Sequence, residues 1–142
     1  MRRFFRKPAA DGAPTGSAEP QAPLVLVIDD SLTETRVLAH TLSKAGYRVE
    51  MAADGREGVD LARRLRPDLI LMDIVMPALN GFEATRLLQR DEATAGIPIV
   101  MITSKDQPTD RTWGLRQGAV DYLVKPVDSE ALLGRIRAIL GR

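Results

Sequence analysis

The sequence predicts an α/β domain with a doubly wound, five-stranded parallel sheet, and two observations carry this prediction. First, from residue 24 onward, five apolar runs of strand length alternate strictly with segments of helical periodicity. Such alternation favours parallel strands joined by right-handed crossovers, with helices on both faces of the sheet. Second, some of the runs are continuously apolar, whereas others contain charged residues. The runs are LVLVI (24–28), YRVEMA (47–52), DLILM (68–72), IPIVMI (97–102) and VDYLV (120–124).

Charged residues inside two of these runs predict the order of the strands. Strands that are buried on both faces read as unbroken apolar runs, whereas edge strands can alternate. The first and fourth runs are unbroken, and so is the third after its initial Asp68, while the second contains Arg48 and Glu50 and the fifth contains Asp121. We therefore expect the second and fifth strands at the edges, which gives a flavodoxin-like (βα)5 sheet of order 2-1-3-4-5.

The helices between the runs begin and end at recognisable signals. Ser31 with Glu34 has the pattern of a capping box, in which each side chain binds the other residue's backbone N–H. The later helices start at similar capping residues: Asp54 with Glu57, Asn80 with Glu83, and Asp128. Gly46 and Pro67 end the first two helices. A further helix, expected at 108–117, shows little amphipathic pattern.

Composition limits the class of protein. A chain of 142 residues with 44% hydrophobic and 27% charged residues is the size of one globular domain. It contains no apolar run long enough to span a bilayer, and MRRFFRKP lacks the apolar segment of a secretory signal. The absence of cysteine excludes disulfides and thiolate metal sites. We expect a cytoplasmic protein.

Residues 1–23 differ from the rest of the chain. They are rich in Pro, Ala and Gly and have no apolar periodicity, which predicts a flexible leader before a domain at 24–142. The leader has a net charge of +2, from four basic and two acidic residues, and the remainder has −1. A domain with this charge is not expected to bind nucleic acid. One short basic cluster is also too weak for stable membrane association.

Polar residues gather at the carboxyl ends of four of the five expected strands. Asp29 and Asp30 follow the first strand, Asp73 the third, Thr103 and Ser104 the fourth, and Lys125 the fifth. In a sheet of this order, ligands bind beyond these ends, at the switch point between the first and third strands. The sequence thus predicts one site that contains three carboxylates, a hydroxyl and an ammonium group.

The types of residue indicate the chemistry of that site. Clustered carboxylates repel one another, so a hard divalent cation is their natural occupant, and Mg²⁺ suits a site with few carboxylates and a phosphoryl ligand. His40 is expected in mid-helix and there is no Cys, which argues against Zn²⁺. A carboxylate beside Mg²⁺, Lys and a hydroxyl is equipped to accept a phosphoryl group. The hypothesis is an aspartyl phosphate.

The motifs VIDDS, LMDIVMP and DYLVKP, together with the Thr that ends the fourth strand, resemble the response-regulator receiver domain of two-component signalling, of which CheY is the single-domain archetype. The resemblance covers residues 24–142. More narrowly, DIVMPALNGFEATR and TSKDQPTDRTWGLRQGAVDYLVKPVD resemble the PilH-type regulators of type IV pilus twitching motility.

The resemblance implies a role for each residue around the metal. Asp73 would be the phosphoacceptor and Asp30 a direct Mg²⁺ ligand. Asp29 would support the ion through water, and the main-chain carbonyl of Val75 would complete the protein ligands. The side chains of Val75 and Lys105 stand at positions where the family varies and the phosphoryl lifetime is tuned.

It also implies a switch. Thr103 would bind the phosphoryl group and move toward it, and Lys125 would form its ion pair, with a cis bond to Pro126 as in the family. Tyr122 would swing inward as Thr103 moves. Each residue also has a plainer interpretation: Lys125 as a turn residue, Thr103 as the end of a strand, Tyr122 as packing.

A receiver implies a sensor histidine kinase as partner, for which a CheA-like hybrid is one option. With Arg142 ending the chain, we expect output by protein–protein contact, through the face formed by the helix at 108–117, the strand at 120–124 and the last helix. Catalysis would be limited to the chain's own phosphotransfer and dephosphorylation. Trp113 would be either a core residue or part of the partner surface.

Three alternatives stay open. The chain could be a phosphate sink that draws phosphoryl groups from a shared kinase. A flavodoxin-like cofactor binder shares the strand order, but Asp29 and Asp30 would repel a phosphate in its binding loop. A haloacid-dehalogenase-type phosphatase needs its two acidic residues two positions apart on the first strand, whereas these are adjacent.

Overall fold

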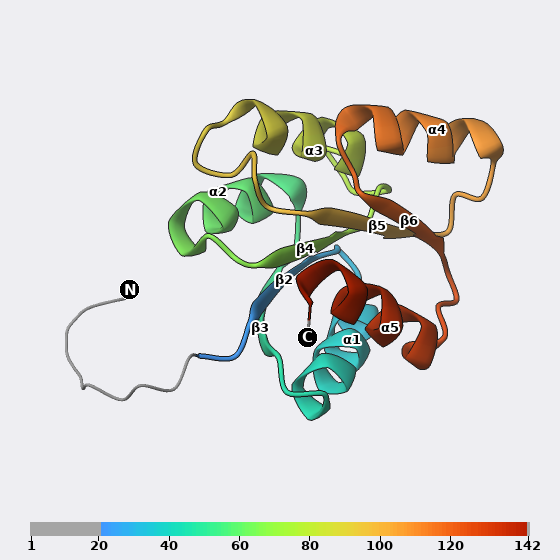
Figure 1. The fold of residues 1–142 in the computed structure, drawn as a ribbon. Helices are drawn as coiled ribbons and strands as arrows, with labels where there is room; N and C mark the ends of the chain where they lie inside the picture. Colours follow the sequence, from blue (N-terminus) through green and yellow to red (C-terminus); the bar gives the residue numbers. More distant parts are fainter. Residues whose placement is uncertain (1–20, 142) are drawn as a thin grey trace.

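The computed structural model describes residues 21–141, so most of the expected leader, residues 1–20, lies outside the described part of the chain. Strands and helices alternate as the sequence predicts (Figure 1). The elements are β2 (Leu24–Ile28), α1 (Leu32–Lys44), β3 (Arg48–Ala52), α2 (Gly55–Leu65), β4 (Leu69–Met72), α3 (Gly81–Arg90), β5 (Ile99–Thr103), α4 (Pro108–Gln117), β6 (Asp121–Val124) and α5 (Ser129–Leu140).

The five strands form one parallel sheet in the order β3-β2-β4-β5-β6. Counted along the chain, this is the order 2-1-3-4-5, so the predicted fold class is confirmed. Helices α1 and α5 cover one face, and α2, α3 and α4 cover the other (Figure 1). The edge strands β3 and β6 carry the charged residues that placed them there, because only an edge strand can expose such side chains to water.

Two large apolar clusters, one on each face, hold α1, α2, α3 and α5 to the sheet. Alternate residues of one strand point to opposite faces. Leu26 and Ile28 therefore pack under α2 and α3, while Val25 and Val27 pack under α1 and α5. All residues of β2, β4 and β5 are buried, which fixes the ends of these strands as a rigid platform.

The predicted caps are present, with one correction. Each of the four capping side chains accepts from the backbone N–H three residues on. A complete capping box forms at Asn80 and Glu83. At Ser31 the predicted box is only half formed: Ser31 N donates to Asp29 Oδ1, and the Glu34 carboxylate binds Lys125. The Glu34 side chain does not complete the cap, because it binds Lys125, which the fold brings from the other end of the chain.

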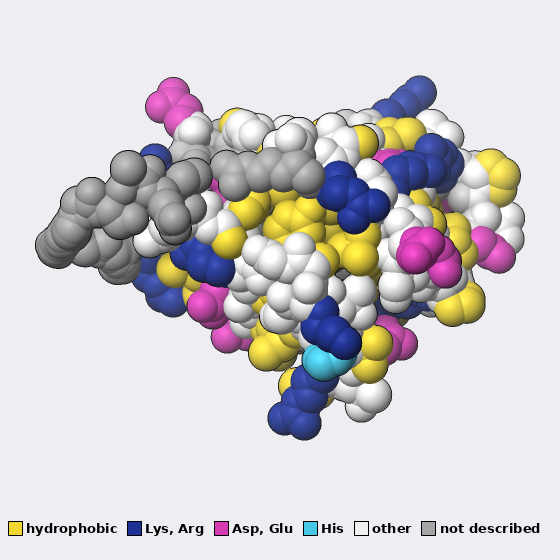
Figure 2. Space-filling view, turned by 60° about the horizontal axis from the view of Figure 1, so that its bottom comes forward, with side chains coloured by type: hydrophobic (Ala, Val, Ile, Leu, Met, Phe, Trp, Pro, Cys, Tyr) yellow, Lys and Arg dark blue, Asp and Glu magenta, His cyan; other side chains and the backbone are white. Residues whose placement is uncertain are grey.

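On the face that α1 and α5 cover, acidic and basic side chains are interspersed around hydrophobic ones (Figure 2). Between residues 21 and 141, no helix combines the length and the apolar character that crossing a bilayer requires.

Candidate functional site

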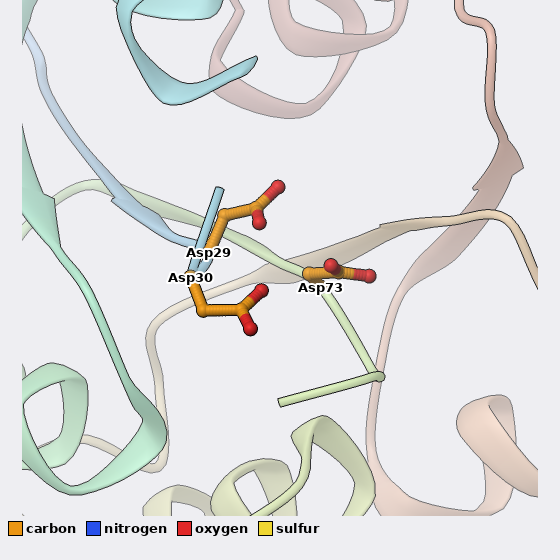
Figure 3. Close-up of side chains that lie close together, drawn as sticks. All are labelled: Asp29, Asp30 and Asp73. Carbon is orange, nitrogen blue, oxygen red and sulfur yellow. The ribbon is translucent and has the colours of Figure 1, made fainter. Parts of the chain in front are cut away.

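Three carboxylates meet where β2 and β4 end. Asp29 and Asp30 follow β2, Asp73 follows β4, and one oxygen of each lies within 4.8 Å of the others. The three side chains project to the same side of the sheet edge (Figure 3). Asp29 and Asp73 are buried, whereas Asp30 is exposed. The structure therefore brings together the acidic residues that the sequence singled out.

Backbone hydrogen bonds hold these carboxylates in place. The N–H of Asp73 donates to Ile28 O at 2.9 Å and that of Asp29 to Ala52 O at 3.1 Å, so both residues continue the pairing of the sheet. Asp73 Oδ1 accepts from Ile74 N at 2.8 Å. One oxygen of Asp73 is thus fixed to the backbone, and Oδ2 remains directed to the site.

Gly81 allows the loop after Asp73 to return against it. Gly81 N donates to Ile74 O at 2.9 Å, and a Cβ at this position would lie 2.2 Å from the carbonyl oxygen of Asp73. No side chain fits at that distance, so only glycine permits this close approach. The chain at Gly81 therefore packs directly against the backbone of Asp73, the candidate phosphoacceptor. Helix α3 starts at Gly81, with Asn80 as its N-cap.

Lys125, between β6 and α5, is the cation of the site. Its Nζ lies 3.0 Å from Asp29 Oδ2 and 3.4 Å from Asp73 Oδ2, and it also binds Glu34 Oε1. Burial opposes the charge of the ammonium group, but its hydrogen bonds to Glu34 and Asp29 outweigh this and hold its pKa above that of an ordinary lysine. Lys125 is charged here, and its bond to Pro126 is cis, as expected.

The charge of Asp73 is disfavoured in the absence of a metal. Burial and the neighbouring Asp29 carboxylate raise the pKa of Asp73 above its ordinary value, although Lys125, the Ile74 N–H and the Thr103 hydroxyl act in the opposite direction. A raised carboxyl pKa from burial and like charge is characteristic of a functional site. A cation bound at this edge would favour the ionised form of Asp73 and so offset the effects of burial and of Asp29.

Thr103 and Tyr122 lie beside the carboxylates. Thr103 is the last residue of β5 and is fully buried. Its hydroxyl lowers the pKa of Asp73 and accepts from Lys105 N at 3.4 Å. Tyr122 is also buried, and its hydroxyl donates to Lys105 O at 2.7 Å. The Tyr122 ring therefore points inward in this structure.

A cleft of about 740 Å³ opens over the carboxylates. Its walls include Val75, Ser104 and Lys125, together with Glu34 and Val37 from α1. Val75 is 57% exposed and lies at the mouth of the cleft. Trp113 is 45% exposed on α4, which rules out the core role considered for it.

Glu34 is the site residue that the sequence interpretation missed. Its only sequence signal was the spacing from Ser31, which points to a helix cap. The contact with Lys125 joins residues 91 positions apart, and no local pattern encodes it.

The donor set fits a hard divalent cation. Carboxylate oxygens are the ligands that Mg²⁺ and Ca²⁺ prefer, and Mg²⁺ needs only one or two of them. Asp30 is exposed and Asp73 has its Oδ2 directed to the site, so oxygens are accessible from the cleft. A metal, an ammonium group and a hydroxyl around one carboxylate are the components of phosphoryl transfer.

Comparison with known proteins agrees with this geometry. Residues 25–137 match the family model of the response regulator receiver domain. The chain is 55% identical over 116 residues to the protein PilH of Pseudomonas aeruginosa, which covers 82% of this chain and 96% of PilH. It is 44% identical over 120 residues to the DNA-binding dual master transcriptional regulator RpaA of Synechocystis, covering 84% of this chain but 50% of RpaA.

Solved structures show the same relationship. The chemotaxis response regulator CheY4 of Vibrio cholerae is 38% identical, with a TM-score of 0.79, over 84% of this chain and 100% of that chain. The chain belongs to the response regulator receiver domain family. Receiver domains bind Mg²⁺ at an acidic pocket, take a phosphoryl group from a histidine kinase and act on a downstream effector. The similarity to PilH over most of the chain confirms the narrower resemblance as well.

Proposed function

We propose that this protein is a phosphorylatable response regulator, which accepts a phosphoryl group from a sensor histidine kinase on Asp73 and signals by protein–protein contact. One observation carries the proposal: the buried Asp73 carboxylate lies beside the carboxylates of Asp29 and Asp30 and within 3.4 Å of the Lys125 ammonium. Cytoplasm is the compartment we propose, since the histidine kinases that serve receivers transfer phosphoryl groups there.

The residues divide the transfer between them. Asp73 Oδ2 attacks phosphorus, the bond from phosphorus to the kinase histidine nitrogen breaks, and its electron pair returns to the imidazole. Lys125 Nζ, 3.4 Å from Oδ2, neutralises charge on the transferred group. The Thr103 hydroxyl, at the end of β5, donates a hydrogen bond to a phosphoryl oxygen in the product.

The acidic residues would hold the metal. We assign Asp30 and Asp73 as direct Mg²⁺ ligands, the main-chain carbonyl of Val75 as a third, and Asp29 as support through water. When bound, Mg²⁺ supplies positive charge against the carboxylates and the phosphoryl oxygens. The chain's own catalysis is then limited to phosphotransfer and dephosphorylation at Asp73.

Output would pass through the face formed by α4, β6 and α5. Tyr122 lies in β6 under this face, and its carbonyl accepts from Arg111 Nη1 of α4 at 2.9 Å, so a shift of Thr103 and Tyr122 would reach α4. Trp113 and Val124 are 45% and 42% exposed there. The partner we propose is a protein of a motility system, such as type IV pilus twitching, because of the similarity to PilH.

Incubation with acetyl phosphate and Mg²⁺ tests the acceptor. We expect intact mass to show one added phosphoryl group on the wild type and none on Asp73→Asn. Asp91→Asn, which changes a carboxylate outside the site, should be labelled like the wild type. Unchanged labelling of Asp73→Asn would contradict the assignment.

A second experiment separates output from a phosphate sink. The beryllofluoride-trapped protein should retain a partner that the untreated protein does not, and Trp113→Ala should weaken that binding. A trapped protein that binds no more than the untreated protein, yet turns over phosphoryl groups rapidly, would favour the sink.

A further inference from the structure

Glu34 is a fourth carboxylate at the site, outside the metal-capable group of Asp29, Asp30 and Asp73. It lies in the first turn of α1 and binds Lys125 Nζ across the cleft that both residues line. This contact ties α1 to the loop between β6 and α5.

Lys125 has no spare donor in this arrangement. An ammonium group has three N–H bonds. Lys125 Nζ has three carboxylate partners, Asp29, Glu34 and Asp73. Transfer makes Asp73 Oδ2 the bridging oxygen to phosphorus, so Oδ2 gives up its own donor, but the negative charge then lies on the phosphoryl oxygens beyond it. The ammonium group must move toward those oxygens, and this movement loosens its contact with Asp29 or with Glu34.

Exposure indicates which partner is released. The Asp29 side chain is 4% exposed, so an Asp29 left without the ammonium would be a buried, unpaired charge, which is costly. The Glu34 side chain is 51% exposed, and water can replace the ammonium there at little cost.

A local capping role does not account for the position of the Glu34 carboxylate. In a capping box it would accept from Ser31 N, but that N–H donates to Asp29 Oδ1 at 2.9 Å. The carboxylate reaches across the cleft to Lys125 instead.

We propose that Glu34 is a positioning residue that holds Lys125 toward α1 and must release it before Lys125 can pair with a phosphoryl oxygen on Asp73. This inference rests on the proposed acceptance of a phosphoryl group at Asp73. Glu34 therefore slows phosphorylation, because the exchange of partners adds to the barrier.

Two substitutions separate the contact from the charge. Glu34→Ala removes both, while Glu34→Asp keeps the negative charge but is one methylene too short to hold Lys125. We expect both variants to accept a phosphoryl group from acetyl phosphate about two- to fivefold faster than the wild type, the range set by a partly exposed ion pair. Glu92→Ala removes an exposed glutamate ahead of β5, at the opposite end of the sheet, and should leave the rate unchanged.

The outcomes distinguish the possible failures. If the wild type takes up no phosphoryl group, the proposed function itself fails. If the wild type is labelled and Glu34→Ala is equally fast, the inference is overturned. If Glu34→Ala is faster but Glu34→Asp matches the wild type, the field of the charge is responsible and the positioning role is overturned.

An independent readout uses the metal-free, unphosphorylated protein. The chain has lysines only at positions 7, 44, 105 and 125, so the ammonium signal of Lys125 can be assigned by ¹⁵N NMR. We expect this signal to be protected from exchange with water in the wild type and in Glu92→Ala. Protection should fall in Glu34→Ala and Glu34→Asp, and unchanged protection in both would overturn the contact.

Discussion

Neutralising Asp73 should stabilise the metal-free protein, although it abolishes the proposed phosphorylation. Asn has the same shape as Asp, and its carbonyl oxygen can still accept from Ile74 N. The substitution therefore changes the charge and leaves the packing in place. Lys125 keeps Asp29 and Glu34 as partners, so no cation is left unpaired.

The magnitude follows from the distances. Asp73 lies within 4.8 Å of two like charges, each of which contributes about 3.5 kcal/mol of repulsion at an effective dielectric constant of about 20. Lys125 at 3.4 Å returns about 5 kcal/mol of attraction on the same scale. Net repulsion is about 2 kcal/mol, and we expect Asp73→Asn to raise the free energy of unfolding by about 1–2 kcal/mol.

Urea unfolding followed by circular dichroism, with EDTA at neutral pH and low salt, measures this gain. In thermal unfolding under the same buffer conditions, the melting temperature of Asp73→Asn should be about 3–6 °C above that of the wild type. With Mg²⁺ the difference should shrink, because binding of the ion stabilises the wild type more. Asp91→Asn offers an opposite control: a bond from Ala93 N and the pairing with Arg63 hold the pKa of Asp91 low, so its loss should not stabilise.

The direction of the pKa shift of Asp73 determines how the stability difference between Asp73→Asn and the wild type depends on pH. The pKa of Asp73 is raised in the folded state, from an ordinary value of 3.8, so its ionisation destabilises the fold. The advantage of Asp73→Asn is complete above the raised pKa, decreases as the pH falls through it, and vanishes below 3.8. A variant less stable than the wild type in EDTA, or a gain that persists at lower pH, would refute the reasoning.

Further predictions concern α4 and Tyr122. A Cβ on Gly114 would lie 2.7 Å from Met101 Sδ and 3.1 Å from the Tyr122 ring, so Gly114→Ala should lower the free energy of unfolding by about 1–3 kcal/mol. In the described part of the chain, a Cβ on Gly134 meets nothing within 4 Å, so Gly134→Ala in α5 should instead stabilise, by up to about 1 kcal/mol in the same urea assay. Burial and, to a smaller extent, the charge of Asp110 raise the pKa of Tyr122 to about 12. The difference in phenolate absorbance between the wild type and Tyr122→Phe should therefore show no ionisation near pH 10. A titration midpoint near pH 10 would contradict this prediction. Tyr122→Phe should also cost about 1 kcal/mol in urea, because the bond to Lys105 O is lost; a neutral result would show that this bond adds nothing.

The sequence predicted the fold and the acidic site for a physical reason. Unbroken apolar runs identify buried parallel strands, and the polar residue that ends each run must lie at the common carboxyl edge. Asp29, Asp73 and Lys125 meet there as expected. Neither the partner of Glu34 nor the inward position of Tyr122 could be predicted, because each depends on side-chain orientation between distant segments.

The helix at 108–117 shows a second limit of prediction from the sequence. Its sequence lacks an amphipathic pattern, yet α4 forms at the predicted bounds. Pro108 occupies its first turn, and Gly114 allows the backbone to approach Tyr122 closely, so packing compensates for the weak pattern. Tertiary contacts of this kind are not visible in the periodicity of one segment.

Chemical mapping of the phosphorylated residue tests the central claim most directly. Reduction of an acyl phosphate with borohydride converts the modified aspartate into homoserine, which peptide sequencing locates. After treatment with acetyl phosphate and Mg²⁺, homoserine should appear at position 73. Homoserine at position 29 or 30, or a phosphate ester on Thr103 or Ser104, would contradict the account.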